Sequence, residues 1–266
     1  MQKRFAIIAL TAALLLGANA EAGRSCESHR LTAKTLERGL QLAEQAMTEL
    51  NAEHARTGAR VVVLGRAGQD LSKYGLRYSH LGFAYRTSTG DWRVLHKLNH
   101  CGTADASLYR QGLGEFFLDD LWRHEAAWVV PHQTVQDKLI ALLSDEHRVT
   151  SMHHKPYSIV SYVWGAKYQQ SNQWAIETLA SAMEAGAASR DRAQAWLMFK
   201  GYEPTSLRLG PLTRLGGRIG AANVAFDDHP DRKRYANDIE TVTVDSVFAW
   251  LQRSGLGGAT RVVRLP

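Results

Sequence analysis

Two histidines and one serine are the residues whose types and spacing suit acyl transfer. His80 heads an apolar, strand-like segment, and His96 ends the next such segment along the chain. A turn between the two segments would pair them as a hairpin and bring the imidazoles together at one end. Ser171 opens a segment with helical spacing, and unpaired N–H groups at a helix start favour developing negative charge. We therefore expect His80 to act as the base, His96 to orient it and Ser171 to act as the nucleophile.

Each of these residues also has an ordinary structural explanation. A single histidine in a strand is more often a buried residue with a satisfied ring. Ser171 at a helix start can serve only to cap the backbone N–H groups of Gln173 or Trp174. The residue types alone leave the catalytic and the structural explanations open.

Three short motifs resemble a known superfamily. Tyr-Ser-His-Leu-Gly-Phe at 78–83 is similar to the Ser-His-x-Gly-hydrophobic strand of the circularly permuted papain-like proteins, and Val-Leu-His at 94–96 falls where that group has its second polar residue. Gln-Ser-Asn-Gln-Trp at 170–174 has the spacing of the group's Asn-Cys-x-x-aromatic motif, with Ser171 at the cysteine position. The superfamily includes bacterial cell-wall peptidases and amidases and the lecithin:retinol acyltransferase group.

The resemblance implies an α+β fold, in which an antiparallel sheet is packed with helices in the permuted papain-like arrangement. It implies catalytic roles for His80, His96 and Ser171. The residues that we expect to contact substrate are Tyr78, Gln173 and Trp174, beside these motifs, and Glu115, which follows a glycine-rich loop.

Serine in place of cysteine leaves three hypotheses. A serine hydroxyl must lose its proton to the histidine during attack, whereas a cysteine is readily ionised beside an imidazolium. The chain is then a hydrolase or acyltransferase that cleaves cell-envelope amide or ester bonds through Ser171. Alternatively, it is a catalytically degenerate protein that binds an envelope ligand, a peptidoglycan peptide or a lipid, without turnover. The third hypothesis is a scaffold in which the histidines are only structural.

Over its whole length the chain is similar to the uncharacterised bacterial domain-of-unknown-function family 2145. The similarity rests on the runs at 68–72, 111–121 and 225–230. It indicates relatives but implies no activity.

The N-terminus has the three parts of a secretion signal. Lys3 and Arg4 precede an apolar run, and two small-x-small sites follow it. We expect residues 1–22 to be the signal peptide; cleavage at the second site leaves a chain that begins at Gly23, and cleavage at the first leaves one that begins at Glu21. The apolar run is shorter than the roughly 20 residues that span a bilayer. We expect a periplasmic or secreted protein with no stable membrane anchor.

The rest of the chain predicts a single domain, 23–266, with a C-terminal extension beyond the papain-like motifs. The net charge of +6 is spread along the sequence without a dense basic block, which makes no case for nucleic acid as a partner. The expected partner is the envelope substrate or ligand.

Two cysteines in an exported chain predict a disulfide between Cys26 and Cys101. The alternative is a reactive Cys101 thiol beside His100. Adjacent histidines at 152–155 and the acidic turn at 227–231 lack the spacing of a metal site, so we expect no metal and no cofactor.

Apolar periodicity predicts the elements that must position these residues. The expected helices are 31–56, 115–123, 133–144, 171–184, 189–199 and 245–253, and the expected strands are 60–64, 78–85, 92–98 and 125–130. We expect 100–114 to be a loop and 204–220 to be irregular. Six tryptophans are expected in the core: Trp122, Trp128, Trp164, Trp174, Trp196 and Trp250.

Overall fold

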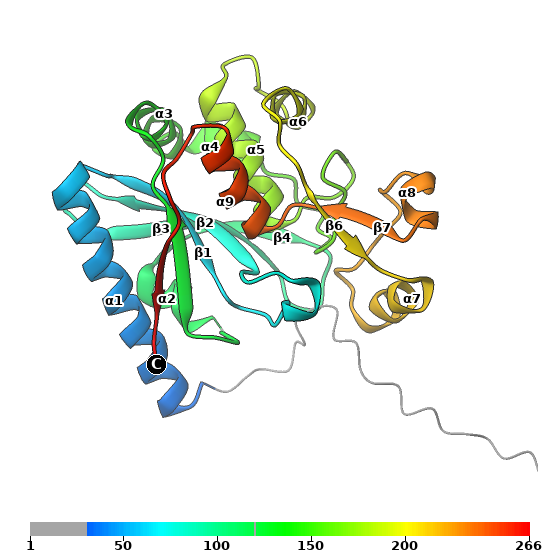
Figure 1. The fold of residues 1–266 in the computed structure, drawn as a ribbon, viewed down its shortest axis with the longest axis horizontal. Helices are drawn as coiled ribbons and strands as arrows, with labels where there is room; N and C mark the ends of the chain where they lie inside the picture. The colour runs from blue at the N-terminus through cyan, green and yellow to red at the C-terminus, as the bar shows by residue number, and fades with distance from the viewer. Residues whose placement is uncertain (1–30, 120) are drawn as a thin grey trace, which may run out of the picture.

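A computed structural model describes residues 31–119 and 121–266 of the chain. The predicted signal segment 1–22 and Cys26 lie outside the described residues. The described chain has an α+β fold: an antiparallel six-stranded sheet with the order β4-β3-β2-β1-β5-β8 is covered by helices on both faces (Figure 1).

The elements of this layered structure come from both halves of the chain. The strands are β1 Val61–Arg66, β2 His80–Arg86, β3 Trp92–Asn99, β4 Ala106–Gly112, β5 Glu125–Val129 and β8 Arg261–Arg264. The helices are α1 Ala33–Thr57, α2 Leu113–Leu118, α3 Gln133–Leu143, α4 Glu146–Ser151, α5 Ser171–Met183, α6 Arg190–Phe199 and α9 Val244–Arg253, with a short 3-10 turn at Ser72–Tyr74.

A second, two-stranded sheet stands at one side of the molecule. It consists of β6 Thr205–Arg208 and β7 Asp238–Thr241, with the helices α7 Pro211–Gly220 and α8 Asp231–Tyr235 beside it (Figure 1). A small apolar cluster around Ile239 holds this part together.

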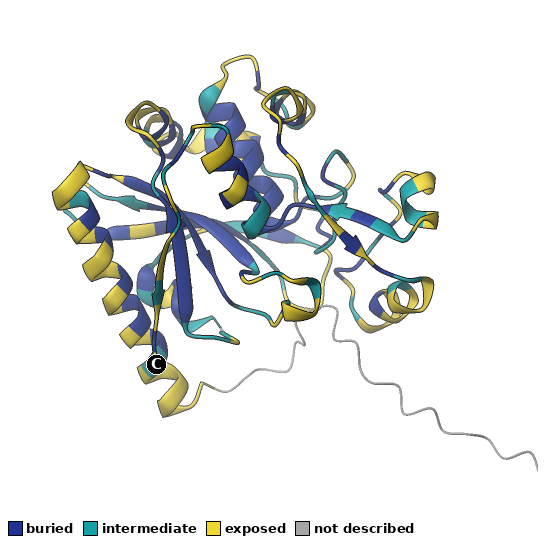
Figure 2. Ribbon diagram, viewed as in Figure 1, coloured by how far each residue is buried: buried dark blue, intermediate teal, exposed yellow. Residues whose placement is uncertain are grey.

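The two faces of the main sheet bury different cores. Strand β1 is buried along its whole length, because Val61 and Val63 pack on one side while Val62 and Leu64 pack on the other (Figure 2). The first core lies beneath α3, α5 and α9, and the second lies beneath α1 and α2. Because neighbouring residues of a strand point to opposite faces, each residue's position decides which core it faces.

The predicted order of elements agrees with the structure in most places. The elements α4, α8, β7 and β8 are not among the expected ones, and three of the expected segments differ. The expected loop 100–114 contains β4, an edge strand whose polar, partly exposed residues hide its alternation. The expected irregular segment 204–220 contains β6 and the whole of α7, whose glycines and proline obscure its helical spacing. The helix expected at 115–123 ends at Leu118.

Trp122 is 44% exposed and is therefore not a core residue, whereas Trp174 and Trp250 are fully buried.

Across the residues that the structure describes, no helix combines the length and the apolar character needed to cross a bilayer.

Candidate functional site

The structure brings the two histidines together across neighbouring strands. His80 begins β2 and His96 lies within β3, and the Nε2 of His80 is 2.8 Å from the Nδ1 of His96. The other ring nitrogen of His96, Nε2, lies 2.7 Å from the Oε1 of Gln111 on β4. Gly82 lies across from His96 in the pairing of β2 with β3, and a Cβ at this position would come to 3.0 Å from the His96 Cβ. Glycine is therefore needed for the close approach of the two strands at this point.

Hydrogen bonding and burial define the state of His96. Its side chain is fully buried, and this burial, reinforced by the positive charge of Arg66, lowers its pKa to about 4. His96 is thus neutral at pH 7. With the amide oxygen of Gln111 as acceptor, His96 donates from Nε2, and its Nδ1 accepts a hydrogen bond from the Nε2–H of His80. This chain orients the His80 ring in the way that a third residue orients a catalytic base.

An ion pair closes the same side of the sheet. Arg66 on β1 bonds to the carboxylate of Asp119 and to the carbonyl of Phe116, and its guanidinium stands 4.5 Å from the centre of the Phe116 ring. Both imidazoles also pack against Phe116, with ring centres at 6.0 and 5.2 Å. The histidine pair is therefore held against α2.

Ser171 does begin α5, but its environment is a different one. Its hydroxyl and its backbone N–H both face the phenolic oxygen of Tyr157 as donors. Tyr157 is buried, which raises its pKa, and the two Ser171 donors partly offset that effect. The cap of the helix is Gln170, whose side chain accepts from the N–H of Asn172 at 2.8 Å. The expected capping role of Ser171 therefore belongs to its neighbour.

The register of the strands separates Ser171 from the histidine pair. Helix α5 packs on the face that carries Phe83, with the rings of Phe83 and Trp174 centred 6.0 Å apart. His80 and His96 point to the other face, toward α2. His80 and His96 therefore lie on the face of the sheet opposite to α5, because neighbouring side chains of a strand alternate between the two faces, and the joint catalytic role of His80, His96 and Ser171 stays a prediction.

A buried lysine occupies the face that Ser171 shares. Lys97 follows His96 in β3, so it points toward α5, and its Nζ donates to the carbonyl of His154 at 2.6 Å and to the carbonyl and Oε1 of Gln169 at 2.8 and 2.9 Å. Burial, reinforced by the charge of Arg190, lowers the pKa of Lys97 to about 6. The three acceptors around the Nζ of Lys97 tie β3 to the segment that leads into α5. No sequence pattern predicts this role, since a charged residue in a strand ordinarily faces water.

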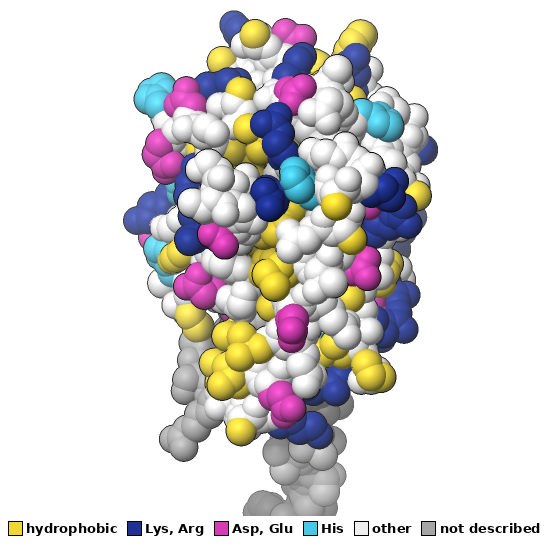
Figure 3. All heavy atoms as spheres, turned by 90° about the vertical axis from the view of Figure 1, so that its left-hand side faces the viewer, with side chains coloured by type: hydrophobic (Ala, Val, Ile, Leu, Met, Phe, Trp, Pro, Cys, Tyr) yellow, Lys and Arg dark blue, Asp and Glu magenta, His cyan; other side chains and the backbone are white. Residues whose placement is uncertain are grey.

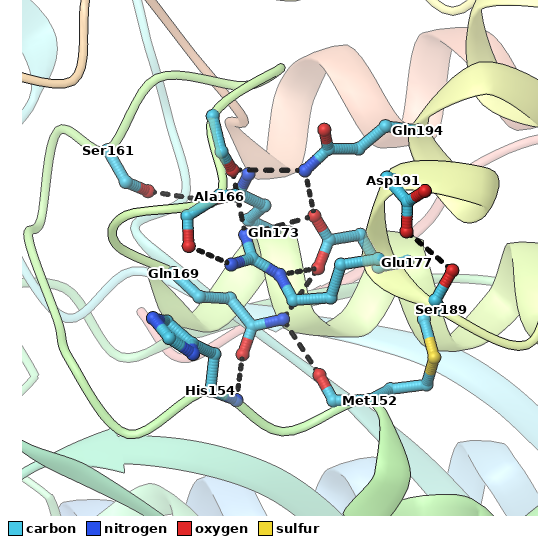
Figure 4. A network of polar contacts seen from close by, with 12 residues as sticks. Met152, His154, Ser161, Ala166, Gln169, Gln173, Glu177, Ser189, Asp191 and Gln194 are labelled. Carbon is cyan, nitrogen blue, oxygen red and sulfur yellow. Dashed lines mark hydrogen bonds and ion pairs between the residues drawn. The ribbon is translucent and has the colours of Figure 1, made fainter.

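A buried carboxylate continues this network (Figure 4). Glu177 of α5 has no exposed side-chain surface and accepts from Gln169 Nε2 at 2.5 Å, Arg190 Nε at 2.8 Å and Gln194 Nε2 at 2.7 Å. Arg190 also donates to the carbonyl of Ala166 at 2.9 Å. Charge pairing and hydrogen bonds therefore fix the loop before α5 to both α5 and α6.

The residues expected to contact substrate serve the protein's own structure. Tyr78 donates from its hydroxyl to Glu125 at 2.7 Å, and Gln173 accepts from Ser161 at 2.7 Å. Trp174 is fully buried. All three side chains are buried in the protein, and their contact with a substrate stays a prediction. Glu115 is exposed and its carboxylate accepts from the N–H of Gly112 at 2.9 Å, and its contact with a ligand stays a prediction.

Other sequence candidates also have internal partners. His154 Nε2 lies 3.0 Å from the carbonyl of Lys167, and Asp227 pairs with the ammonium of Lys167. His229 lies 3.0 Å from Asp228. Cys101 is in the exposed turn after β3, and its pairing with Cys26 stays a prediction.

A shallow groove opens on the face of the sheet that carries the histidine pair. Its volume is about 400 Å³, and we call it the α1–α2 groove. It is lined by Ala43, Glu44, Met47 and Asn51 of α1, by Gly90, Asp91 and Trp92 of the hairpin, and by Leu113 and Gly114 of α2. Figure 3, which views the molecule from the α1 side, shows apolar side chains interspersed with carboxylates. The groove thus combines apolar walls with two acidic groups.

Comparison with known proteins adds a family but no activity. Residues 53–251 match the family model described as an uncharacterised protein conserved in bacteria. No curated protein and no solved structure matches the chain.

Proposed function

The chain belongs to the uncharacterised bacterial family DUF2145, and we propose that it is an exported, catalytically degenerate relative of the papain-like proteins that binds a peptidoglycan peptide in the α1–α2 groove. In this proposal Ser171 performs no acyl transfer. The observation that carries the proposal is the separation of Ser171 from both imidazoles by the sheet.

Acyl transfer requires a nucleophile within hydrogen-bond reach of its base. The two heavy atoms are then about 2.6–3.2 Å apart, or are bridged by one water molecule. The hydroxyl of Ser171 is instead directed at buried Tyr157, while His80 is bonded to His96 on the other face. The hydroxyl therefore has no path to the imidazole that would take its proton. A serine without an aligned base is a poor nucleophile.

The α1–α2 groove supports binding as the function. Its volume is within the range of about 300–1,000 Å³ that is usual for ligand sites. Met47 and Leu113 supply apolar contact, and the carboxylates of Glu44 and Asp91 suit an ammonium group. Peptidoglycan stem peptides carry small apolar side chains and free amines, so they fit this lining better than an acyl lipid does.

A serine hydrolase or acyltransferase is the second candidate. It is favoured by two observations, the oriented His80–His96 pair and the position of Ser171 at the start of a long helix. It requires one of the histidines to turn to the opposite face of the sheet. Binding and cleavage assays on matched variants distinguish the two candidates.

Soluble peptidoglycan fragments are titrated into the wild type, Ser171→Ala and Met47→Arg, with binding followed by calorimetry and cleavage by mass spectrometry. We expect wild-type affinity in Ser171→Ala, at least about tenfold weaker binding in Met47→Arg, and no cleavage by any of them. Leu36→Arg is the matched control, since Leu36 is a 40% exposed residue of the same helix outside the groove. Cleavage that Ser171→Ala abolishes would establish the enzyme instead, and equal binding by Met47→Arg would show that the groove is not the binding site.

A further inference from the structure

Helix α7 carries an apolar stripe that faces solvent. Leu212 is 84% exposed, Leu215 is 54% exposed and Ile219 is 79% exposed. Residues three and four apart lie on one face of a helix, so these three side chains form a continuous row. We call this row the α7 stripe.

The amphipathic pattern of α7 is the reverse of that of an ordinary surface helix. Gly217 is its one buried residue among those described, and its place in the helical repeat puts it on the side opposite the stripe. The helix therefore packs against the rest of the protein at Gly217 and directs its large apolar side chains into solvent. The core gains nothing from these side chains.

The chain segment that carries the stripe is cationic. Between Glu203 and Asp227 the sequence contains three arginines and no acidic residue. Arg208 and Arg218 are exposed, whereas Arg214 donates to the carbonyls of Leu209 and Arg234 and so fastens α7 to α8. On α8, Tyr235 is 73% exposed.

We propose that the α7 stripe, with Arg208 and Arg218, docks the protein reversibly on an anionic lipid bilayer surface. Apolar side chains on one face of a short helix insert shallowly at the headgroup boundary, and flanking arginines attract anionic headgroups. A ten-residue helix is only about 15 Å long, which is small for the roughly 800 Å² per partner of a stable protein interface. The bilayer needs no such area, because it supplies apolar depth and charge together.

The composition of α7 supports a surface helix that gains stability on docking. Three of its ten residues are glycine, the residue that is least favourable in a helix after proline. Burial of the stripe in the headgroup region would compensate for this low propensity. Docking by one short helix is peripheral and reversible, in agreement with the absence of a stable anchor that the sequence predicts.

The test is flotation of the purified protein with two kinds of vesicle, pure phosphatidylcholine and phosphatidylcholine containing phosphatidylglycerol. We expect binding to the anionic vesicles that is at least about tenfold stronger than to the neutral ones and that weakens with salt. The triple variant L212Q/L215Q/I219Q should lose binding to both. R208Q/R218Q should lose the preference for anionic lipid. M198Q/F199Q, which changes two other exposed apolar residues on α6, should behave as the wild type.

Thermal unfolding of each variant checks that the fold is kept. The proposal would be overturned if the wild-type protein bound neither kind of vesicle, or if the triple variant bound vesicles as strongly as the wild type. So would a wild-type dimer in solution that the triple variant dissociates, because the stripe would then belong to a second copy of the chain. Equal loss of binding in M198Q/F199Q would likewise overturn it, since the effect would not belong to α7.

Discussion

Lowering the pH should destabilise the folded protein through His96. The imidazole is fully buried, between Gln111 and the positive charge of Arg66, with His80 bonded to its Nδ1. Its pKa is about 4 in the folded chain against 6.5 when it is free in water. The unfolded state therefore binds a proton at a pH at which the folded state does not. Stability contributed by neutral His96 is complete above pH 6.5 and is lost as the pH falls from 6.5 to about 4.

The size of this effect follows from the two pKa values. A difference of roughly 2.5 units at about 1.36 kcal/mol per unit gives a loss of about 3 kcal/mol. For a domain of this size that corresponds to a fall in melting temperature of roughly 6–12 °C. Urea unfolding at several pH values between 7 and 4 measures it directly, as a slope of free energy against pH.

The variant His96→Gln isolates the contribution, because it removes the titrating group and leaves every other one. Its unfolding free energy at pH 7 should be lower than that of the wild type, and this difference should narrow by about 3 kcal/mol as the pH approaches 4. His147→Gln, at an exposed position of α4, is the matched control and should follow the wild type. Parallel curves for His96→Gln and the wild type would refute the reasoning, since they would mean that folded His96 takes up its proton normally.

Three further outcomes are expected. Glu177→Gln should lower the free energy of unfolding by about 3–5 kcal/mol, because it leaves buried donors facing an amide in place of a carboxylate, and a lower urea midpoint would show it. Glu184→Gln, at the exposed end of α5, is the control and should have little effect; an equal, small change in both variants would contradict the role of the Glu177 network. Reduction of the protein should lower its melting temperature if Cys26 and Cys101 are bonded, a loop closure worth about 4 kcal/mol; two titratable thiols in the unfolded, unreduced protein would disprove the bond. The protein recovered from exporting cells should have the mass of the chain without its first 20 or 22 residues, and a retained N-terminus would disprove export.

The elements that apolar periodicity marks strongly could be predicted from the sequence. Helix α1 matches its expected range within about two residues because Leu42, Ala46 and Leu50 repeat at helical steps and are all fully buried. Strand β4 escapes prediction because an edge strand has one neighbour and keeps polar residues such as Arg110 partly exposed. Helix α7 escapes prediction because its apolar stripe faces solvent, so no buried pattern marks it.

The candidate site was predictable in part for a related reason. Hairpin geometry places His80 beside His96 regardless of what covers the sheet. A shift of one residue along a strand moves a side chain from the face beneath α5 to the face beneath α2. The order of the motifs along the chain does not indicate which of the two faces a residue takes. The roles of Lys97 and Glu177 depend on partners distant in sequence, so residue type alone predicts solvent exposure for both.

The measurement that tests the central claim most directly is labelling with a fluorophosphonate, which reacts covalently with a serine that an aligned histidine activates. The folded wild type is incubated with the reagent beside an active serine hydrolase, and adducts are mapped by mass spectrometry. We predict no adduct on Ser171, because α5, which Ser171 begins, packs on the face of the sheet opposite to the one that carries His80. A stoichiometric adduct on Ser171 that disappears in His80→Ala would contradict the claim.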